Sequence, residues 1–135
     1  MRPYVSLDIR NVALAGHAHS GKTSLTSAML FAAGATSRLL RTEEGSTTTD
    51  FDEEEIERRH SISTGLAYLE WNKKKINLLD TPGLSAFFQD TRLCLSAADA
   101  VLLTVDGATG VQVQTEMVFA LADELHLPLF FVVTK

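Results

Sequence analysis

Eight consecutive residues near the amino terminus have the composition of a phosphate-binding loop. They read Gly16-His17-Ala18-His19-Ser20-Gly21-Lys22-Thr23 and fit the pattern G-x-x-x-x-G-K-[ST]. The two glycines allow a backbone that turns successive N–H groups inward as an anion-binding nest. The Lys22 ammonium would reach the β- and γ-phosphates of a nucleoside triphosphate, and the Thr23 hydroxyl would bind Mg²⁺. We therefore predict that residues 16–23 bind nucleotide, with Lys22 stabilising the transferred phosphoryl group in catalysis. A glycine-rich turn without a ligand is the structural alternative.

A second short motif, Asp80-Thr81-Pro82-Gly83, follows the apolar residues 76–79. In α/β sheets, ligands bind beyond the carboxyl ends of the strands. Asp80 is therefore placed to hold a magnesium-bound water. Gly83 is placed to donate its N–H to a γ-phosphate, because no side chain blocks the approach. We predict that all four residues bind nucleotide and that Gly83 takes part in catalysis. A turn that merely closes a strand is the alternative.

The polar residues 36–60 and the hydroxyl side chains that follow them have the character of a switch. A hydroxyl there would complete the magnesium shell when a γ-phosphate is present and leave when it is absent. The candidates are Ser61, Ser63 and Thr64, each of which is otherwise an ordinary hydroxyl at a strand edge. Any of the three would complete a metal site beside Thr23 and Asp80.

The elements that must position these motifs alternate along the chain. Apolar runs predict strands at residues 9–15, 100–106 and 129–133, and a hairpin of residues 61–71 and 75–80 around a turn at 72–74. Helices are expected at residues 22–33 and 113–125, with a short one between residue 83 and the strand at 100–106. The predicted inward faces are Leu25, Met29, Ala32 and Ala33 in the first helix, and Val113, Met117, Ala120, Leu121 and Leu125 in the second.

This order predicts an α/β fold with an open sheet. The near-continuous apolar strand at residues 100–106 indicates a parallel sheet that is buried on both faces. A right-handed crossover normally continues with a helix that returns over the sheet, whereas this sequence stops just after a strand. We therefore expect residues 1–135 to be a partial domain that lacks its carboxyl-terminal portion.

Composition narrows the classes of protein further. With 135 residues and 45% hydrophobic residues, the chain suits one folded domain rather than a disordered chain. No apolar run reaches the length of a membrane span, and the first ten residues lack a secretion signal, so we predict no membrane partner and a cytoplasmic location. A single cysteine, Cys94, excludes an internal disulfide. A net charge of −5 argues against direct, sequence-specific nucleic-acid binding.

Taken together, the motifs resemble the G domain of translational GTPases, specifically elongation factor G and its close paralogues. The resemblance covers nearly the whole chain and is carried by residues 11–17, 20–25, 49–51, 57–62, 77–83, 99–101, 106–112 and 114–116. It implies a P-loop NTPase fold with a mostly parallel sheet, an antiparallel edge strand and helices on both faces. It also implies GTP and GDP as nucleotides, Mg²⁺ bound by Thr23 and Ser61, and the ribosome as partner. Ser24, Thr134 and Lys135 join the nucleotide site by the same resemblance.

The sequence departs from the family's pattern in four respects. Leu84 stands where a histidine positions the attacking water, and its side chain can neither hydrogen-bond water nor stabilise charge. His19 replaces the usual aspartate of the loop. Ser61 replaces the switch threonine, preceded by Arg58-Arg59-His60 instead of R-G-I. The guanine-reading motif N-K-x-D is represented only by Thr134-Lys135.

Three functional hypotheses follow. The first is a GTP-hydrolysing switch domain of an elongation-factor-G-like translation factor. The second, motivated by Leu84, is a nucleotide-binding switch with little or no hydrolysis. The third is a P-loop phosphotransferase that uses ATP.

Overall fold

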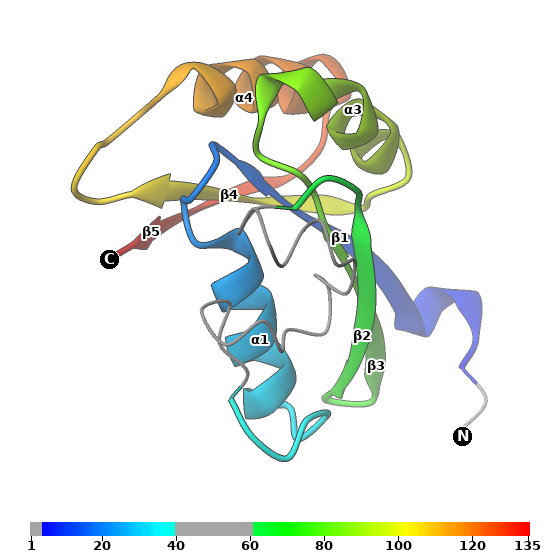
Figure 1. Ribbon diagram of the computed structural model, residues 1–135. Coiled ribbons are helices and arrows are strands. Elements are labelled where there is room, and N and C mark those ends of the chain that lie inside the picture. Colours follow the sequence, from blue (N-terminus) through cyan, green and yellow to red (C-terminus); the bar gives the residue numbers. More distant parts are fainter. Residues whose placement is uncertain (1–3, 40–60) are drawn as a thin grey trace.

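Five strands form one sheet in the order β2-β3-β1-β4-β5 in the computed structural model, which describes residues 4–39 and 61–135 (Figure 1). The strands are β1 (Ile9–Gly16), β2 (Gly65–Trp71), β3 (Lys74–Asp80), β4 (Ala100–Asp106) and β5 (Leu129–Thr134). The helices are α1 (Lys22–Ala32), α3 (Phe88–Ser96) and α4 (Val113–Glu124), with 3-10 turns at Ser6–Asp8 and Ser85–Phe87. This order of elements confirms the predicted α/β fold.

The sheet is parallel except at one edge. β1 runs parallel to both β3 and β4, and β4 runs parallel to β5. β2 is the antiparallel edge strand that pairs with β3. The turn between them is one residue shorter than predicted. Its two residues, Asn72 and Lys73, have φ angles of 48° and 67°, as a type I′ hairpin turn requires.

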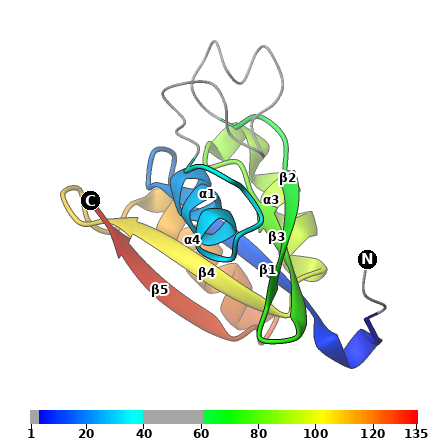
Figure 2. The same cartoon turned by 90° about the horizontal axis from the view of Figure 1, so that it is seen from below.

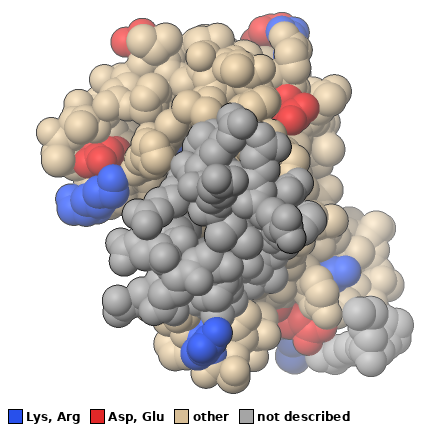
Figure 3. Space-filling model, in the orientation of Figure 1, with Lys and Arg blue, Asp and Glu red and all other residues tan. Residues whose placement is uncertain are grey.

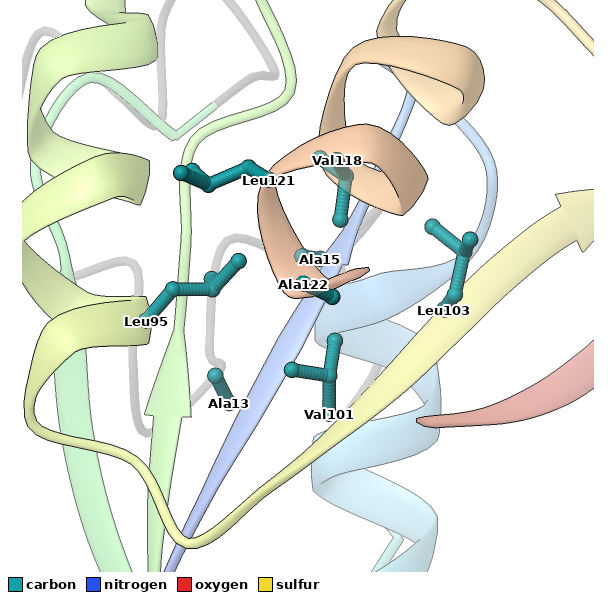
Figure 4. Packing of buried hydrophobic residues seen from close by; sticks show 8 residues of the cluster. All are labelled: Ala13, Ala15, Leu95, Val101, Leu103, Val118, Leu121 and Ala122. Atoms are coloured by element: carbon teal, nitrogen blue, oxygen red, sulfur yellow. The ribbon is translucent and has the colours of Figure 1, made fainter. Parts of the chain in front are cut away.

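Helices cover both faces of the sheet. α1 lies on one face, and α3 and α4 lie on the other (Figures 1 and 2). The core under α3 and α4 is a cluster of fully or nearly fully buried aliphatic side chains (Figure 4). Its members are Ala13, Ala15, Leu95, Val101, Leu103, Val118, Leu121 and Ala122. A second cluster under α1 is formed by Leu14, Leu30, Ala67, Leu69 and Leu78.

The inward face predicted for α4 was wrong by about one residue. Val113 is 69% exposed, and Met117 and Ala120 are also exposed, although Leu121 is buried as predicted. The buried residues are instead Gln114, Thr115, Val118, Leu121 and Ala122. A capping box between Gln112 and Thr115 fixes the start of the helix and turns two polar residues inward. A pattern of apolar residues alone therefore gave the wrong rotation of the helix.

The buried face of α1 and the start of β2 also differ from the sequence predictions. In α1, Leu30 is buried and Ala32 is exposed, whereas Leu25, Met29 and Ala33 pack against the second cluster as predicted. The strand expected from residue 61 begins only at Gly65.

Within the described residues, no helix has the length and apolar character to cross a membrane.

Candidate phosphate-binding site

The glycine-rich loop connects the end of β1 to the start of α1. Gly16 is the last residue of β1 with a φ of 143°, and Gly21 precedes α1 with a φ of 85°. Both angles are ones that L-residues with side chains rarely adopt. His19 between them also has a positive φ, of 60°. The loop therefore has the reversed backbone turns that an anion-binding nest needs.

The start of α1 adds further donors at the same place. The N–H groups in the first turn of a helix have no acceptor within the helix. In α1, the intrahelical bonds begin with Leu25, whose N–H donates to the Gly21 carbonyl at 2.9 Å. The positive end of the helix dipole therefore points at the loop, which favours an anion there. Ser24, in this first turn, is exposed.

Lys22 is held inside the loop and does not extend into solvent. It is the first residue of α1 and only 6% exposed. Its ammonium donates to the carbonyl oxygens of Gly16 at 3.2 Å and of His17 at 2.8 Å. These two contacts fix the direction of the side chain, so the positive charge already lies beside the first two residues of the loop.

The second motif lies directly against the first. A Cβ atom added to Gly83 would contact the Lys22 ammonium and lie 2.6 Å from the backbone nitrogen of Ala18. Thr81 anchors this motif, since both its N–H and its hydroxyl donate to the Leu14 carbonyl, at 3.1 and 2.8 Å. The adjacent Pro82 is buried. The structure thus brings together two elements more than 60 residues apart in sequence, as the rule for strand ends predicted.

The hydroxyl groups chosen as metal ligands meet at this edge of the sheet. Thr23 Oγ1 lies 3.4 Å from Ser61 Oγ. Asp80, 1% exposed, ends β3 and pairs in register with Leu14 of β1. Ser63 is exposed, and Thr64 instead accepts a hydrogen bond from the Cys94 thiol at 3.1 Å. Ser61 is therefore the candidate hydroxyl that the structure brings to Thr23.

This donor set fits Mg²⁺ better than a transition metal. Among residues 4–39 and 61–135, no three or more His, Cys, Asp or Glu side chains gather into a metal-binding group. Two hydroxyls and one carboxylate are hard oxygen donors. Magnesium in proteins is usually held by one or two carboxylates together with substrate phosphates and water. The residues present therefore fit a magnesium–nucleotide complex rather than a metal site made wholly of protein ligands.

The end of β5 reaches the loop from the other side. The Thr134 hydroxyl donates to the Ser20 carbonyl at 2.7 Å. The Lys135 ammonium donates to the His19 carbonyl at 2.6 Å and pairs with Asp106 at 2.9 Å. The Lys135 hydrogen bond, aided by the Ala108 N–H, lowers the pKa of Asp106. Asp106 was not predicted as a site residue, although it ends β4 just as Asp80 ends β3.

Leu84 follows Gly83 directly and begins the 3-10 turn that leads into α3. Its carbonyl accepts the Phe87 N–H at 3.0 Å, and its side chain is partly buried. A leucine side chain has no atom that donates or accepts a proton. Residues 40–60 of the predicted switch segment, which include the motif positions at 49–51 and 57–60, lie outside the described part of the chain.

Comparison with known proteins gives one family and a set of relatives. The family model described as the elongation factor Tu GTP binding domain matches residues 7–135. A protein named ribosome-releasing factor 2, mitochondrial, from Drosophila grimshawi is 41% identical over 128 residues, which are 95% of this chain and 17% of that protein. The protein of the same name from Drosophila willistoni is 40% identical over 135 residues, 100% of this chain and 18% of that protein. The chain thus spans less than a fifth of the curated relatives it matches.

Solved structures show the same arrangement. A crystal structure of a Thermus thermophilus protein is 48% identical with a TM-score of 0.90, covering 94% of this chain and 19% of that one. Translation elongation factor SelB from Methanococcus maripaludis, solved with the GTP analogue GppNHp, is 21% identical with a TM-score of 0.69. That alignment covers 93% of this chain and 22% of the other, and at this identity it shows the fold alone.

Proposed function

The chain belongs to the elongation factor Tu GTP-binding domain family of translational GTPases, and we propose that it binds GTP and GDP with Mg²⁺ and hydrolyses GTP as the switch domain of an elongation-factor-G-like factor. The observation that carries this proposal is the contact between the two phosphate motifs. Gly83 lies so close to Ala18 and Lys22 that a γ-phosphate held by the loop would meet the Gly83 N–H. Such an arrangement distinguishes a triphosphate from a diphosphate.

Each residue near this contact has a defined role in the proposal. The N–H groups of residues 16–23 and of Ser24 bind the phosphates, and Lys22 stabilises the charge that develops on the transferred phosphoryl group. Thr23, Ser61 and Asp80 would hold Mg²⁺, Asp80 through a bound water. When bound, the ion neutralises charge on the β- and γ-phosphate oxygens. Because the loop, Lys22 and Asp80 are already positioned by β1, α1 and β3, they stabilise the transition state with little reorganisation.

A second candidate function rests on Leu84. Hydrolysis requires a water oriented for attack on the γ-phosphate, and a side chain beside Gly83 is well placed to do so. Leu84 lacks the donor and acceptor atoms for that task. The alternative is a switch that binds GTP and GDP and changes state with little or no hydrolysis of its own. Stimulation of single-turnover GTP cleavage by ribosomes would remove this alternative.

The partner and the cellular role of the whole protein are also proposals. The relatives are named ribosome-releasing factors, which supports action on the ribosome and favours a role in ribosome release. Their names also place them in mitochondria. The cytoplasmic location expected from the sequence therefore stays a prediction for this chain.

Titration of a fluorescent guanine nucleotide with Mg²⁺ tests the proposal directly. Lys22→Ala should weaken binding about 10- to 150-fold, the equivalent of a charge-assisted hydrogen bond of about 1.5–3 kcal/mol. Lys73→Ala is the matched control, because Lys73 lies in the hairpin turn at the end of β2, outside the phosphate loop. Unchanged binding by Lys22→Ala would contradict the assigned site. Stronger competition by ATP than by GTP would favour the phosphotransferase hypothesis instead.

A further inference from the structure

Three hydroxyl side chains connect the phosphate loop to the ends of β4 and β5. Ser20, in the loop, is 2% exposed, and its Oγ lies 2.6 Å from Oγ1 of Thr104 in β4. Its carbonyl accepts the Thr134 hydroxyl of β5 at 2.7 Å. We propose that Thr104, Ser20 and Thr134 form a hydroxyl clamp that positions the loop for phosphates, whichever base the nucleotide carries. This inference rests on the proposed nucleotide binding and adds positioning residues to it.

The direction of the hydrogen bonds in the clamp follows from the acceptors. Ser20 Oγ lies 2.7 Å from the His17 carbonyl, which can only accept, so Ser20 donates its proton there. When Ser20 donates to His17, the single Thr104 proton is shared between Ser20 Oγ at 2.6 Å and the Ala15 carbonyl at 3.2 Å. Thr104 is completely buried. Each hydroxyl therefore has an acceptor within reach, and Ser20 and Thr104 are buried, where loss of a hydrogen-bond partner is costly.

Thr134 controls the orientation of one peptide group. All peptide bonds in the described residues are trans, so the Gly21 N–H points away from the Ser20 carbonyl. When Thr134 holds that carbonyl on the β5 side, the Gly21 N–H is directed toward the interior of the loop. His19 and Gly21 on either side of Ser20 both have positive φ angles, of 60° and 85°. Such backbone geometry persists only where the surroundings hold it.

The first glycine of the loop makes room for the clamp. Gly16 and Thr104 are register partners between β1 and β4. A Cβ atom on Gly16 would lie 2.5 Å from the Thr104 carbonyl oxygen and 2.7 Å from its hydroxyl. A side chain at Gly16 would therefore displace the hydroxyl that reaches Ser20. Position 16 therefore requires glycine for its packing against Thr104 as well as for the backbone turn.

The clamp makes a prediction that separates it from base recognition. The Thr134 hydroxyl has one proton, and its shortest contact is with the Ser20 carbonyl rather than with the 3.3 Å Val105 carbonyl. If Thr134 acts through the loop, its removal should weaken GDP and inorganic pyrophosphate, which carries no base, by the same factor. If Thr134 instead read the base, only GDP would be weakened.

The test uses matched hydroxyl deletions and two measurements. Thr134→Val and Ser20→Ala should each raise the dissociation constants of fluorescent GDP and, by competition, of inorganic pyrophosphate with Mg²⁺ about tenfold, and Thr134→Ser should restore them to within about twofold. Thr104→Val combined with Ser20→Ala should weaken binding by less than the product of the two single effects, since both substitutions remove the contact between Ser20 and Thr104. Thr26→Val is the control. Its hydroxyl is 1% exposed and donates to the Lys22 carbonyl within α1 at 3.1 Å, outside the clamp.

Thermal unfolding of the nucleotide-free proteins separates positioning from folding. Thr26→Val should lower Tm without changing either dissociation constant. Wild-type affinity in both Thr134→Val and Ser20→Ala, or a loss confined to GDP, would overturn the clamp while leaving nucleotide binding intact. If Thr134→Val does not fold, the folded Thr134→Ser and Ser20→Ala variants decide the question in the same way. A wild-type protein that binds no guanine nucleotide would overturn the proposed function, and the clamp with it.

Discussion

Replacing Gly83 with alanine probes the contact between the two phosphate motifs. The new Cβ would lie 2.6 Å from the Ala18 nitrogen and 2.7 Å from the Ala18 Cα, whereas ordinary contact begins at 3.4 Å. The contact with Lys22 involves the end of a side chain, whereas Ala18 presents backbone atoms that cannot move separately. One of the two motifs must therefore retreat by about 0.8 Å, and a shift near 1 Å at a reacting group reduces activity about 10²-fold.

The loss should fall mainly on the triphosphate. Gly83 is proposed to donate its N–H to the γ-phosphate, and a hydrogen bond to a charged group contributes about 1.5–3 kcal/mol. At 1.4 kcal/mol per tenfold change, GTP should bind about 10- to 150-fold more weakly. GDP has no γ-phosphate, so its affinity should change by less than about threefold. Equilibrium titration with fluorescent GTP and GDP analogues measures both values.

A matched glycine provides the control for this experiment. Gly34, just after α1, has no heavy atom within 4 Å of an added Cβ, but its φ is 72°. Gly34→Ala should therefore lower the stability of the fold by about 1 kcal/mol and leave both affinities unchanged. The backbone of Gly83 lies outside the left-handed region, so Gly83→Ala reports the contact and not backbone strain. An unaltered ratio of GTP to GDP affinity would refute the proposed role of Gly83.

Three other perturbations have defined outcomes. Leu84→His should raise single-turnover GTP cleavage about 10²-fold, because it restores a side chain that can position water; an unchanged rate would argue against that role for position 84. Asp106→Asn should lower Tm near neutral pH, since the depressed pKa of Asp106 means that the carboxylate stabilises the fold above its unfolded value near 3.9. That difference in Tm should close as the pH falls through the lower folded value, and a constant difference between pH 3 and pH 7 would contradict the assignment. Leu103→Ala should reduce the free energy of unfolding, measured by urea denaturation, by about 2–5 kcal/mol, because Leu103 on β4 is completely buried in the core under α3 and α4.

The sequence predicted those parts of the site whose chemistry depends on contiguous residues. The loop at residues 16–23 needs glycines and a lysine at fixed spacing, so its pattern was visible without any tertiary contact. Asp80 and Gly83 were predicted by a rule about strand ends, and the register of Leu14 with Asp80 agrees with it. The choice of Ser61 among three hydroxyls depended on the resemblance, and the structure brings that hydroxyl to Thr23.

What the sequence did not reveal depends on pairing between distant residues. Thr104 reads as an ordinary β-branched residue in an apolar strand, and only its register with Gly16 brings its hydroxyl to the loop. Asp106 similarly gained its partner from Lys135 at the end of the next strand. The rotation of α4 was mispredicted because Gln114 and Thr115 are buried while Val113 and Met117 are exposed. A hydrophobicity pattern takes account of residue type alone. The capping box of α4 and the pairing of neighbouring strands instead determine which way these side chains point.

The proposed site must hold a polyphosphate on a chain with a net charge of −5. On the face shown in Figure 3, the described Lys and Arg side chains lie apart from one another and form no single patch. Screening confines the effect of such charges to about 8–10 Å, so attraction must come from the loop itself. Lys22 is already held in place by two carbonyl oxygens, which reduces the side-chain entropy lost on binding.

Asp80 should make the proposed site dependent on a cation. A carboxylate that is 1% exposed at the edge of an anion site repels phosphate unless a positive ion lies between them. Chelation of Mg²⁺ should therefore weaken GDP binding at least tenfold in the wild-type protein. Asp80→Asn removes the repulsion along with the ligand, so its affinity should change much less on chelation. If the wild type and Asp80→Asn responded equally to chelation in the same fluorescent titration, Asp80 would not be the residue that couples the metal to the nucleotide.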